Sequence, residues 1–298
     1  MNSTFASCVQ RILVRLLVVG LGAFSLAPSA HAQTPLLEPN TVHWAYSAYF
    51  GTGWYKVRDE RDVFVLRIAP QWAVREAGLS EDGERSIGID ARLMITTGLD
   101  SFSLDDLPGA IRADNLASLS AMPGIDVTVP VNERWTLRPH ASLGWGRILG
   151  ESDSAWTYWA GLKSRYTFAN GDLEWALINS VTYVGYTPSD GPSANFWPLM
   201  TGLEFDYPLA GRKIAGEQLV LSWHGLYTAF GKDLDLDFIT GESDLIRDQW
   251  ELGFSVRKKE SRFKMGWFKF ERLGLAYRVS SSGNLKGISL VVKSTFDR

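Results

Sequence analysis

Apolar and polar residues alternate with a period of two along most of the chain beyond residue 42. The clearest stretch is 87–96. Its two rows are Ile87, Ile89, Ala91, Leu93 and Ile95 against Gly88, Asp90, Arg92, Met94 and Thr96. Alternation of this kind predicts a β-strand whose faces meet different surroundings. Because Asp90 and Arg92 share one face, the pattern excludes a sandwich-core strand and favours a barrel strand between lipid and a polar lumen.

Twelve stretches carry this alternation, which predicts an all-β fold, a transmembrane antiparallel up-and-down β-barrel of about 12 strands. The predicted strands are 42–57, 63–74, 87–96, 116–131, 135–147, 155–168, 173–186, 196–207, 219–229, 249–257, 271–279 and 285–296. An even count places both ends of the chain at one end of the barrel. The short turns at 132–133 and 170–171 then share that end, and the longer connections 100–115, 187–195 and 230–247 share the other.

Some residues leave the strand count open. Pro70, Pro139 and Pro198 lie inside predicted strands, where each removes a hydrogen bond of the ladder. Between Phe263 and Phe270 the aromatic residues lose the period of two, which indicates a bulge or a turn. Ten and fourteen strands therefore remain alternatives, and so does a soluble all-β protein of the periplasm.

The N-terminal residues have the features of a secretory signal peptide. Arg11 and Arg15 precede an apolar run that is too short to span a bilayer, and the small residues 30–32 follow it. We predict cleavage between Ala32 and Gln33, a short periplasmic leader at 33–41 and a barrel over 42–298. The alternative is a retained N-terminal anchor. The predicted location is the outer membrane of a Gram-negative cell, reached by a cleaved signal peptide.

Composition after cleavage agrees with this interpretation. The first 32 residues carry two arginines and no acidic residue, so their removal lowers the formal charge from −3 to −5. A mildly acidic chain gives no electrostatic reason to expect nucleic acid as a partner. The only cysteine, Cys8, lies in the predicted signal. All 12 tryptophans lie beyond it, which suits aromatic girdles at the two membrane interfaces.

The last predicted strand, 285–296, organises the barrel. Its outward row ends in an aromatic residue, as in bacterial outer-membrane barrels; the row is Ile288, Leu290, Val292 and Phe296, which we predict to be the assembly signal. The strand must pair with 42–57, because lipid tolerates no open sheet edge. The expected partners are the barrel-assembly machinery, periplasmic chaperones, and outer-membrane lipids with lipopolysaccharide. We expect Phe296→Ala to lower outer-membrane levels and deletion of Asp297 and Arg298 to leave them unchanged.

The ending of the chain resembles a known family. The segments Phe268-Lys-Phe-Glu-Arg-Leu-Gly-Leu-Ala-Tyr-Arg278 and Leu285-Lys-Gly-Ile-Ser-Leu290 are similar to the solitary outer-membrane autotransporter β-barrel domains. The resemblance implies a twelve-stranded translocator-type barrel without a passenger, and it implies no catalytic residue. Pro35 and Pro39 make the leader unsuited to a lumen-filling helix. With no passenger present, self-secretion is in doubt.

Candidate chemistry is sparse, and the expected role is structural rather than enzymatic. His140 and Ser142 share an inward face, as do Ser222 and His224, but this spacing alone does not make an activated nucleophile. The carboxylates between Asp233 and Asp248 are more typical of a solvated loop than of a Ca²⁺ site, since Phe238 stands where an EF-hand loop has glycine. We predict no cofactor and no metal.

Charged residues predicted to face the lumen have both signs. They are Arg67, Asp90, Arg92, Arg138, Lys163, Arg165, Glu174, Glu204, Asp206, Glu251, Arg257 and Arg278. Such residues either pair and seal the lumen, or line a narrow channel for small solutes. Twelve strands lie between the filled eight-stranded and the open sixteen-stranded barrels. A structural role in the envelope therefore comes first, a small-solute pore second, and a lipid-modifying enzyme a distant third.

Overall fold

The computed structural model describes residues 51–57, 61–79, 85–100, 118–148, 154–170, 173–189, 193–214, 216–235, 245–265 and 268–297. The chain divides into two compact units, Met1–Glu38 and Pro39–Arg298, and every described residue belongs to the second. The predicted signal peptide, its cleavage site at Ala32 and Gln33, and the leader 33–41 lie outside the described residues. In the described part of the chain, no helix is long and apolar enough to cross a membrane.

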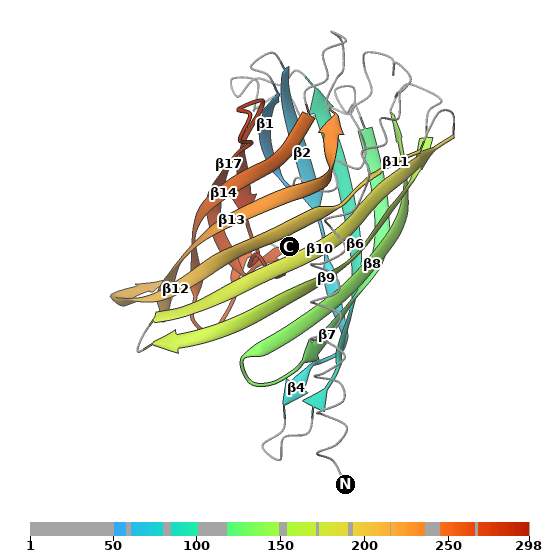
Figure 1. Ribbon diagram of the computed structural model, residues 1–298. Helices are drawn as coiled ribbons and strands as arrows, with labels where there is room; N and C mark the ends of the chain where they lie inside the picture. Colours follow the sequence, from blue (N-terminus) through green and yellow to red (C-terminus); the bar gives the residue numbers. More distant parts are fainter. Residues whose placement is uncertain are drawn as a thin grey trace. The chain divides into compact units, whose positions relative to one another are not determined.

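One antiparallel sheet closes on itself (Figure 1). Its strands are β1 (Gly53–Val57), β2 (Arg61–Ile68), β3 (Gln71–Arg75), β6 (Gly88–Asp100), β7 (Ser118–Pro130), β8 (Trp135–Ile148), β9 (Ser154–Asn170), β10 (Leu173–Pro188), β11 (Ala194–Phe196), β12 (Pro198–Ile214), β13 (Glu217–Asp235), β14 (Leu245–Lys258), β17 (Arg272–Val279) and β18 (Leu285–Val291). Each strand pairs with its neighbours along the chain, and β1 pairs with β18 from Gly53↔Ser289 to Val57↔Leu285. The predicted pairing of the first and last strands is confirmed.

Two barrel strands are interrupted at the prolines that the sequence singled out. β2 and β3 both pair with β6 in one register, on either side of Ala69 and Pro70. β11 and β12 both pair with β10 in one register, on either side of Trp197. Counting each interrupted pair as one strand gives twelve, so the predicted fold and strand count are confirmed. The irregular stretch near 263–270 is a separate hairpin of β15 (Phe263–Met265) and β16 (Phe268–Phe270).

The connections sort into two ends of the barrel. The turn end carries the turns at 131–134, 171–172 and 215–216, the β15–β16 hairpin and a hairpin of β4 (Gly78–Leu79) and β5 (Arg85–Ser86). The loop end carries the connections 58–60, 101–117, 149–153, 189–193, 236–244 and 280–284. At the turn end, the Asn132 side chain accepts hydrogen bonds from the backbone N–H groups of Arg134 (2.9 Å) and Trp135 (2.8 Å). The connections named in the prediction follow this division, but the turn end also carries the connections 76–87 and 259–271, which are longer than 58–60 and 280–284 at the loop end.

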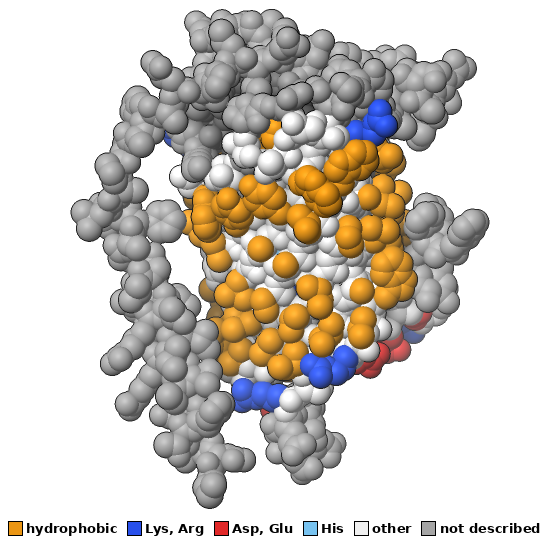
Figure 2. Space-filling model, turned by 90° about the vertical axis from the view of Figure 1, so that its right-hand side faces the viewer, with side chains coloured by type: hydrophobic (Ala, Val, Ile, Leu, Met, Phe, Trp, Pro, Cys, Tyr) orange, Lys and Arg blue, Asp and Glu red, His pale blue; other side chains and the backbone are white. Residues whose placement is uncertain are grey.

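The outer wall is an apolar belt. Large side chains such as Trp156 (56% exposed) and Leu275 (55% exposed) point away from the barrel. Figure 2 shows this belt on one face, with Lys and Arg gathered at its edges. Aromatic rings stack across neighbouring strands, including Phe168 on Trp175 (3.9 Å between centroids) and Phe205 on Trp223 (4.0 Å). Rows of this kind fit the girdles expected at membrane interfaces.

Inward-facing side chains near the loop end form a contiguous apolar layer. Its members are Tyr55, Val65, Met94, Met122, Ala155, Trp159, Val184, Tyr186, Phe196, Phe230, Ile246 and Leu285, all between 0 and 8% exposed. Among the described residues, they come from every barrel strand except β8 and β17. Side chains lining a water-filled passage would be exposed, so the barrel is filled at this level. The sequence predicted a polar lumen throughout; the structure adds this apolar layer to it.

The end of the last predicted strand differs from the prediction. β18 stops at Val291, and the following residues 292–297, here called the tail, turn into the lumen. Ile288 (48% exposed) and Leu290 (45%) face outward as predicted, but Val292 is half-buried beyond the strand and Phe296 is 4% exposed. The predicted outward row that ends in Phe296 is therefore wrong. The tail bends because Ser294, Thr295 and Asp297 find polar partners inside the barrel.

Candidate functional site

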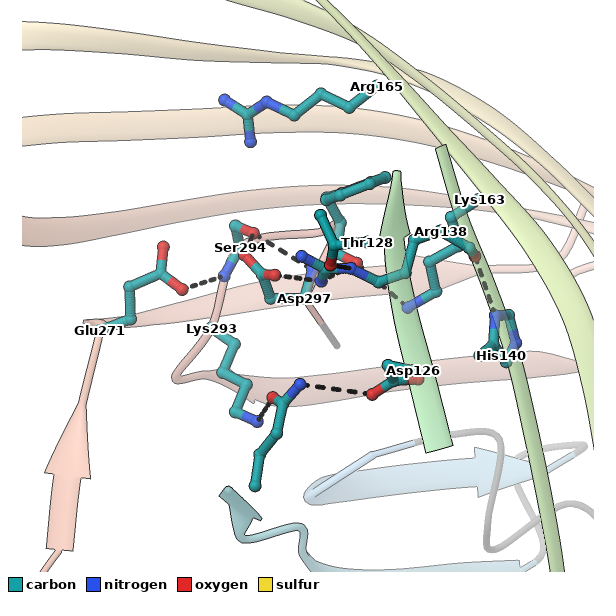
Figure 3. A network of polar contacts seen from close by, with 12 residues as sticks. Asp126, Thr128, Arg138, His140, Lys163, Arg165, Glu271, Lys293, Ser294 and Asp297 are labelled. Atoms are coloured by element: carbon teal, nitrogen blue, oxygen red, sulfur yellow. Dashed lines mark hydrogen bonds and ion pairs between the residues drawn. The ribbon is translucent and has the colours of Figure 1, made fainter. Parts of the chain in front are cut away.

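The tail is held in the lumen by basic residues of β8 and β9 (Figure 3). The Phe296 carbonyl accepts hydrogen bonds from Lys163 Nζ (3.2 Å) and Arg138 Nη1 (3.4 Å). The Arg138 guanidinium also forms an ion pair with the Asp297 carboxylate and lies 4.4 Å from the centroid of the Phe296 ring. Arg138 Nε donates to Thr128 Oγ1 at 3.2 Å, which orients the guanidinium toward the tail. The end of the chain is thus fixed by several charge-assisted contacts.

Asp297 is the acidic residue of the tail, and charged and polar groups surround its carboxylate. It lies outside the barrel strands, and the Ser294 hydroxyl donates to its carboxylate at 2.5 Å. Burial alone would raise the pKa of the Asp297 carboxyl, but Arg138 and the Ser294 hydroxyl together lower that pKa to about 2. The carboxylate therefore stays ionised near neutral pH, where it can pair with Arg138.

Glu204 of β12 is the centre of the charged layer. Its carboxylate is 2% exposed and accepts hydrogen bonds from Thr295 Oγ1 (2.6 Å) and the Thr295 backbone N–H (3.1 Å). It also pairs with Arg165 of β9 (3.1 Å) and Arg272 of β17 (3.3 Å). Since β9, β12 and β17 are separated around the barrel by β10, β13 and β14, Glu204 connects distant parts of the wall through the lumen.

Phe296 occupies an apolar patch on β10. Ala176 and Ile178, both 0% exposed, form one cluster with Phe296, and Met200 of β12 packs against it. The tail therefore combines an aromatic anchor with the polar contacts of its neighbours. An aromatic side chain contributes much of the binding energy where it fills a pocket that excludes water.

The tail also crosses the seam where the barrel closes. Lys293 follows β18 and donates to the Ala69 carbonyl (3.3 Å) and to Gln71 Oε1 (3.1 Å). Those acceptors belong to the β2–β3 strand, which lies on the far side of β1 from β18. Gln71 in turn donates to Asp126 of β7 at 3.3 Å. The contacts of Lys293 thus connect the residues after β18 to the β2–β3 strand, across β1, from inside the barrel.

The predicted lumen charges occupy the inner face in several groups. Besides the residues around the tail, Arg92 pairs with Asp126 (3.3 Å), Arg257 pairs with Asp206 (2.9 Å), and Arg278 pairs with Glu251. Glu174 is 49% exposed at the turn end and lies 3.5 Å from Arg165. Arg67 and Asp90 are both half-buried. The paired charges come from neighbouring strands more often than from opposite walls.

Four residues of the network were missed at the sequence level: Asp126, Arg272, Lys293 and Thr295. Asp126 stands in the inward phase of its strand, between Ile125 and Val127, so periodicity alone could have found it. Arg272 stands at the start of a predicted strand. The alternation places Lys293 and Thr295 on the inward row of the last predicted strand, but it gives no sign of their partners across the lumen.

Three of the four His and Ser candidates for chemistry contact other polar side chains, whereas the buried Ser222 hydroxyl makes no hydrogen bond within the described residues. His140 Nε2 accepts a hydrogen bond from Trp159 Nε1 at 3.0 Å, and Ser142 Oγ accepts one from Arg92 Nη2 at 3.2 Å. His224 Nε2 lies 2.8 Å from Glu251 Oε1. These contacts tie His140, Ser142 and His224 into the lumen packing. The geometry offers them a structural role.

The acidic connection is only partly described, since 236–244 lie outside the described residues. Asp248 accepts hydrogen bonds from the Tyr227 hydroxyl (3.0 Å) and the Ser281 backbone N–H (3.2 Å). Within the part of the chain that the structure describes, no group of three His, Cys, Asp or Glu side chains could hold a metal ion.

No protein-family model and no curated protein matches the chain. Solved barrels are similar in fold. The β domain of the Bordetella autotransporter BrkA is 14% identical over 80% of this chain and 92% of its own, with a TM-score of 0.49. The translocator domain of NalP from Neisseria meningitidis is 11% identical over 79% and 82%, with a TM-score of 0.48. The transport unit of AIDA-I from Escherichia coli is 12% identical over 86% and 99%, with a TM-score of 0.44. These values describe similar barrels and assign no function.

Proposed function

We propose that the chain is an integral outer-membrane barrel whose lumen is filled, with a structural role in the envelope. One observation carries this proposal: the tail and the charged residues around it fill the lumen toward the turn end, while the apolar layer fills it toward the loop end. A passenger-translocating barrel needs an unobstructed lumen, and so does a pore. The outward apolar belt supports insertion into lipid.

The partners proposed for such a barrel follow from its surroundings. Outer-membrane phospholipid and lipopolysaccharide would contact the apolar belt. The barrel-assembly machinery and periplasmic chaperones would deliver the chain. The outward residues Ile288 and Leu290 of β18 remain candidates for an assembly signal. Phe296 supports this role less well, because it is buried in the lumen.

The filled lumen predicts that the purified barrel does not conduct ions. We expect planar bilayers containing folded protein to show no stepwise current, since the inner side chains leave no aqueous path. Folding is verified in the same sample by heat-modifiable migration on a gel. Stable steps of uniform conductance would contradict the proposal and would favour the small-solute channel.

Lipid contact predicts a large effect of a charge placed on the belt. Leu275, in the middle of β17, is 55% exposed. In a bilayer, Leu275→Arg should cost about 2–4 kcal/mol if the position lies near the midplane, whereas in water an exposed substitution changes stability by about 0.5 kcal/mol or less. Urea unfolding in lipid vesicles measures this difference. An unchanged midpoint would support the soluble periplasmic alternative.

A further inference from the structure

The outer wall is hollowed around Gly225 of β13. Gly225 faces outward between Trp223 and Tyr227, and it pairs with Leu203 of β12 and Leu252 of β14. A Cβ atom at Gly225 would meet nothing within 4 Å. The missing side chain at Gly225 therefore leaves open space on the wall.

The space forms a groove with a volume of about 480 Å³. It is lined by Thr201, Gly202, Leu203, Phe205, Trp223, Gly225, Leu226, Tyr227 and Trp250. All of these except Thr201, Tyr227 and the glycines have wholly hydrocarbon or indole surfaces. The volume lies within the range of about 300–1,000 Å³ in which proteins hold small ligands.

Aromatic pairs fix both ends of the groove. At one end Trp223 stacks on Phe205, with centroids 4.0 Å apart and planes 9° apart. At the other, Tyr227 lies 4.7 Å from Trp250, and the Tyr227 hydroxyl donates to Asp248 at 3.0 Å. Rings held by stacking and hydrogen bonding lose little freedom when a ligand binds, which favours affinity.

We infer that this groove binds an acyl chain of a membrane phospholipid. The inference rests on the proposed membrane location, since the groove belongs to the outward apolar belt that would face lipid. A hydrocarbon chain there would contact apolar side chains on several sides, whereas elsewhere on the convex belt it would contact one. The gain is the sum of many dispersion contacts, each small. The polar atoms of Thr201, Tyr227 and Asp248 lie at the loop-end side of the groove, toward the headgroups.

The test fills the groove without disturbing the wall. Gly225→Leu places a side chain into open space, and Ala160→Leu adds the same atoms to an exposed outward position on β9. Each protein is reconstituted in phosphatidylethanolamine vesicles, extracted in mild detergent and analysed by native mass spectrometry. We expect a phospholipid adduct that survives collisional activation in the wild type and in Ala160→Leu, and its loss in Gly225→Leu.

The outcomes distinguish failure of the acyl-chain site from failure of the proposed membrane location. Failure of all three proteins to insert into vesicles would overturn the proposed function itself. Insertion with the same adduct in all three, or with none, would overturn the acyl-chain site alone. Loss of a dimer rather than of a lipid in Gly225→Leu would assign the groove to a second copy of the chain. A heat-modifiable gel shift confirms that each variant is folded.

Discussion

Deletion of residues 294–298 is expected to lower the free energy of unfolding of the barrel by about 3 kcal/mol or more, because a buried aromatic side chain and several charge-assisted contacts are lost together. The deletion removes the carboxylate that pairs with Arg138 and the hydrogen bonds that Thr295 gives to Glu204. It also removes Phe296 from its patch on β10, and truncation of a buried Phe costs about 3–5 kcal/mol in its own right. Urea unfolding in detergent micelles, followed by tryptophan fluorescence, measures the loss.

Two companion variants separate the contributions of the tail. Phe296→Ala keeps the polar contacts of the tail, so it should lose only the stability that packing of the Phe296 ring contributes. Deletion of Asp297 and Arg298 should also destabilise the barrel, because Asp297 is paired with Arg138. This reverses the sequence-based expectation that those two residues are dispensable. If the 294–298 deletion unfolds at the same urea concentration as the wild type, the tail is only loosely held in the lumen.

Glu204→Gln is expected to cost about 3–5 kcal/mol, because it removes the buried carboxylate that pairs with Arg272, which is 2% exposed, and with the partly buried Arg165. Arg165 and Arg272 both lie within 3.3 Å of the Glu204 carboxylate, which is 2% exposed. The amide keeps the size of the side chain, so packing is conserved and the lost charge is isolated. The same urea titration reports the change.

The matched control is Glu174→Gln. Glu174 pairs with the same Arg165 at 3.5 Å, but it is 49% exposed. Exposed ion pairs contribute about 0–1 kcal/mol, so this variant should unfold close to the wild type. Equal effects of the two substitutions would mean that water reaches Glu204, and the lumen would then not be sealed at its level.

Periodicity was enough to predict the wall of the barrel. Leu143, Trp145 and Trp156 could be placed outward from their spacing alone, because one face of each strand meets one kind of surroundings. The same spacing placed Arg138 and Glu204 inward. Even the interrupted strands were marked in the sequence by Pro70 and Pro198, where the ladder breaks.

The partners inside the barrel could not be predicted in this way. Thr295 meets Glu204 across 91 positions of sequence, and Phe296 meets Arg138 across 158. Residues so far apart in sequence meet only when the barrel closes. The local pattern of apolar and polar residues carries no information about that closure. Between Ile288 and Phe296, Ser294 is the only polar residue in the outward row, and one polar residue does not distinguish a continuing strand from an inward bend. The apolar layer was missed because alternation tells which residues face inward but not how full the interior is.

The position of the tail has a consequence for the order of folding. Its binding site is composed of residues from β3, β8, β9, β10, β12 and β17, and these surround one space only after β1 has joined β18. Docking of the tail must therefore follow closure of the ring. Contacts that form after the rate-limiting step leave the folding rate unchanged and slow unfolding. The tail thus acts as a latch, holding shut a barrel that the strands have already completed.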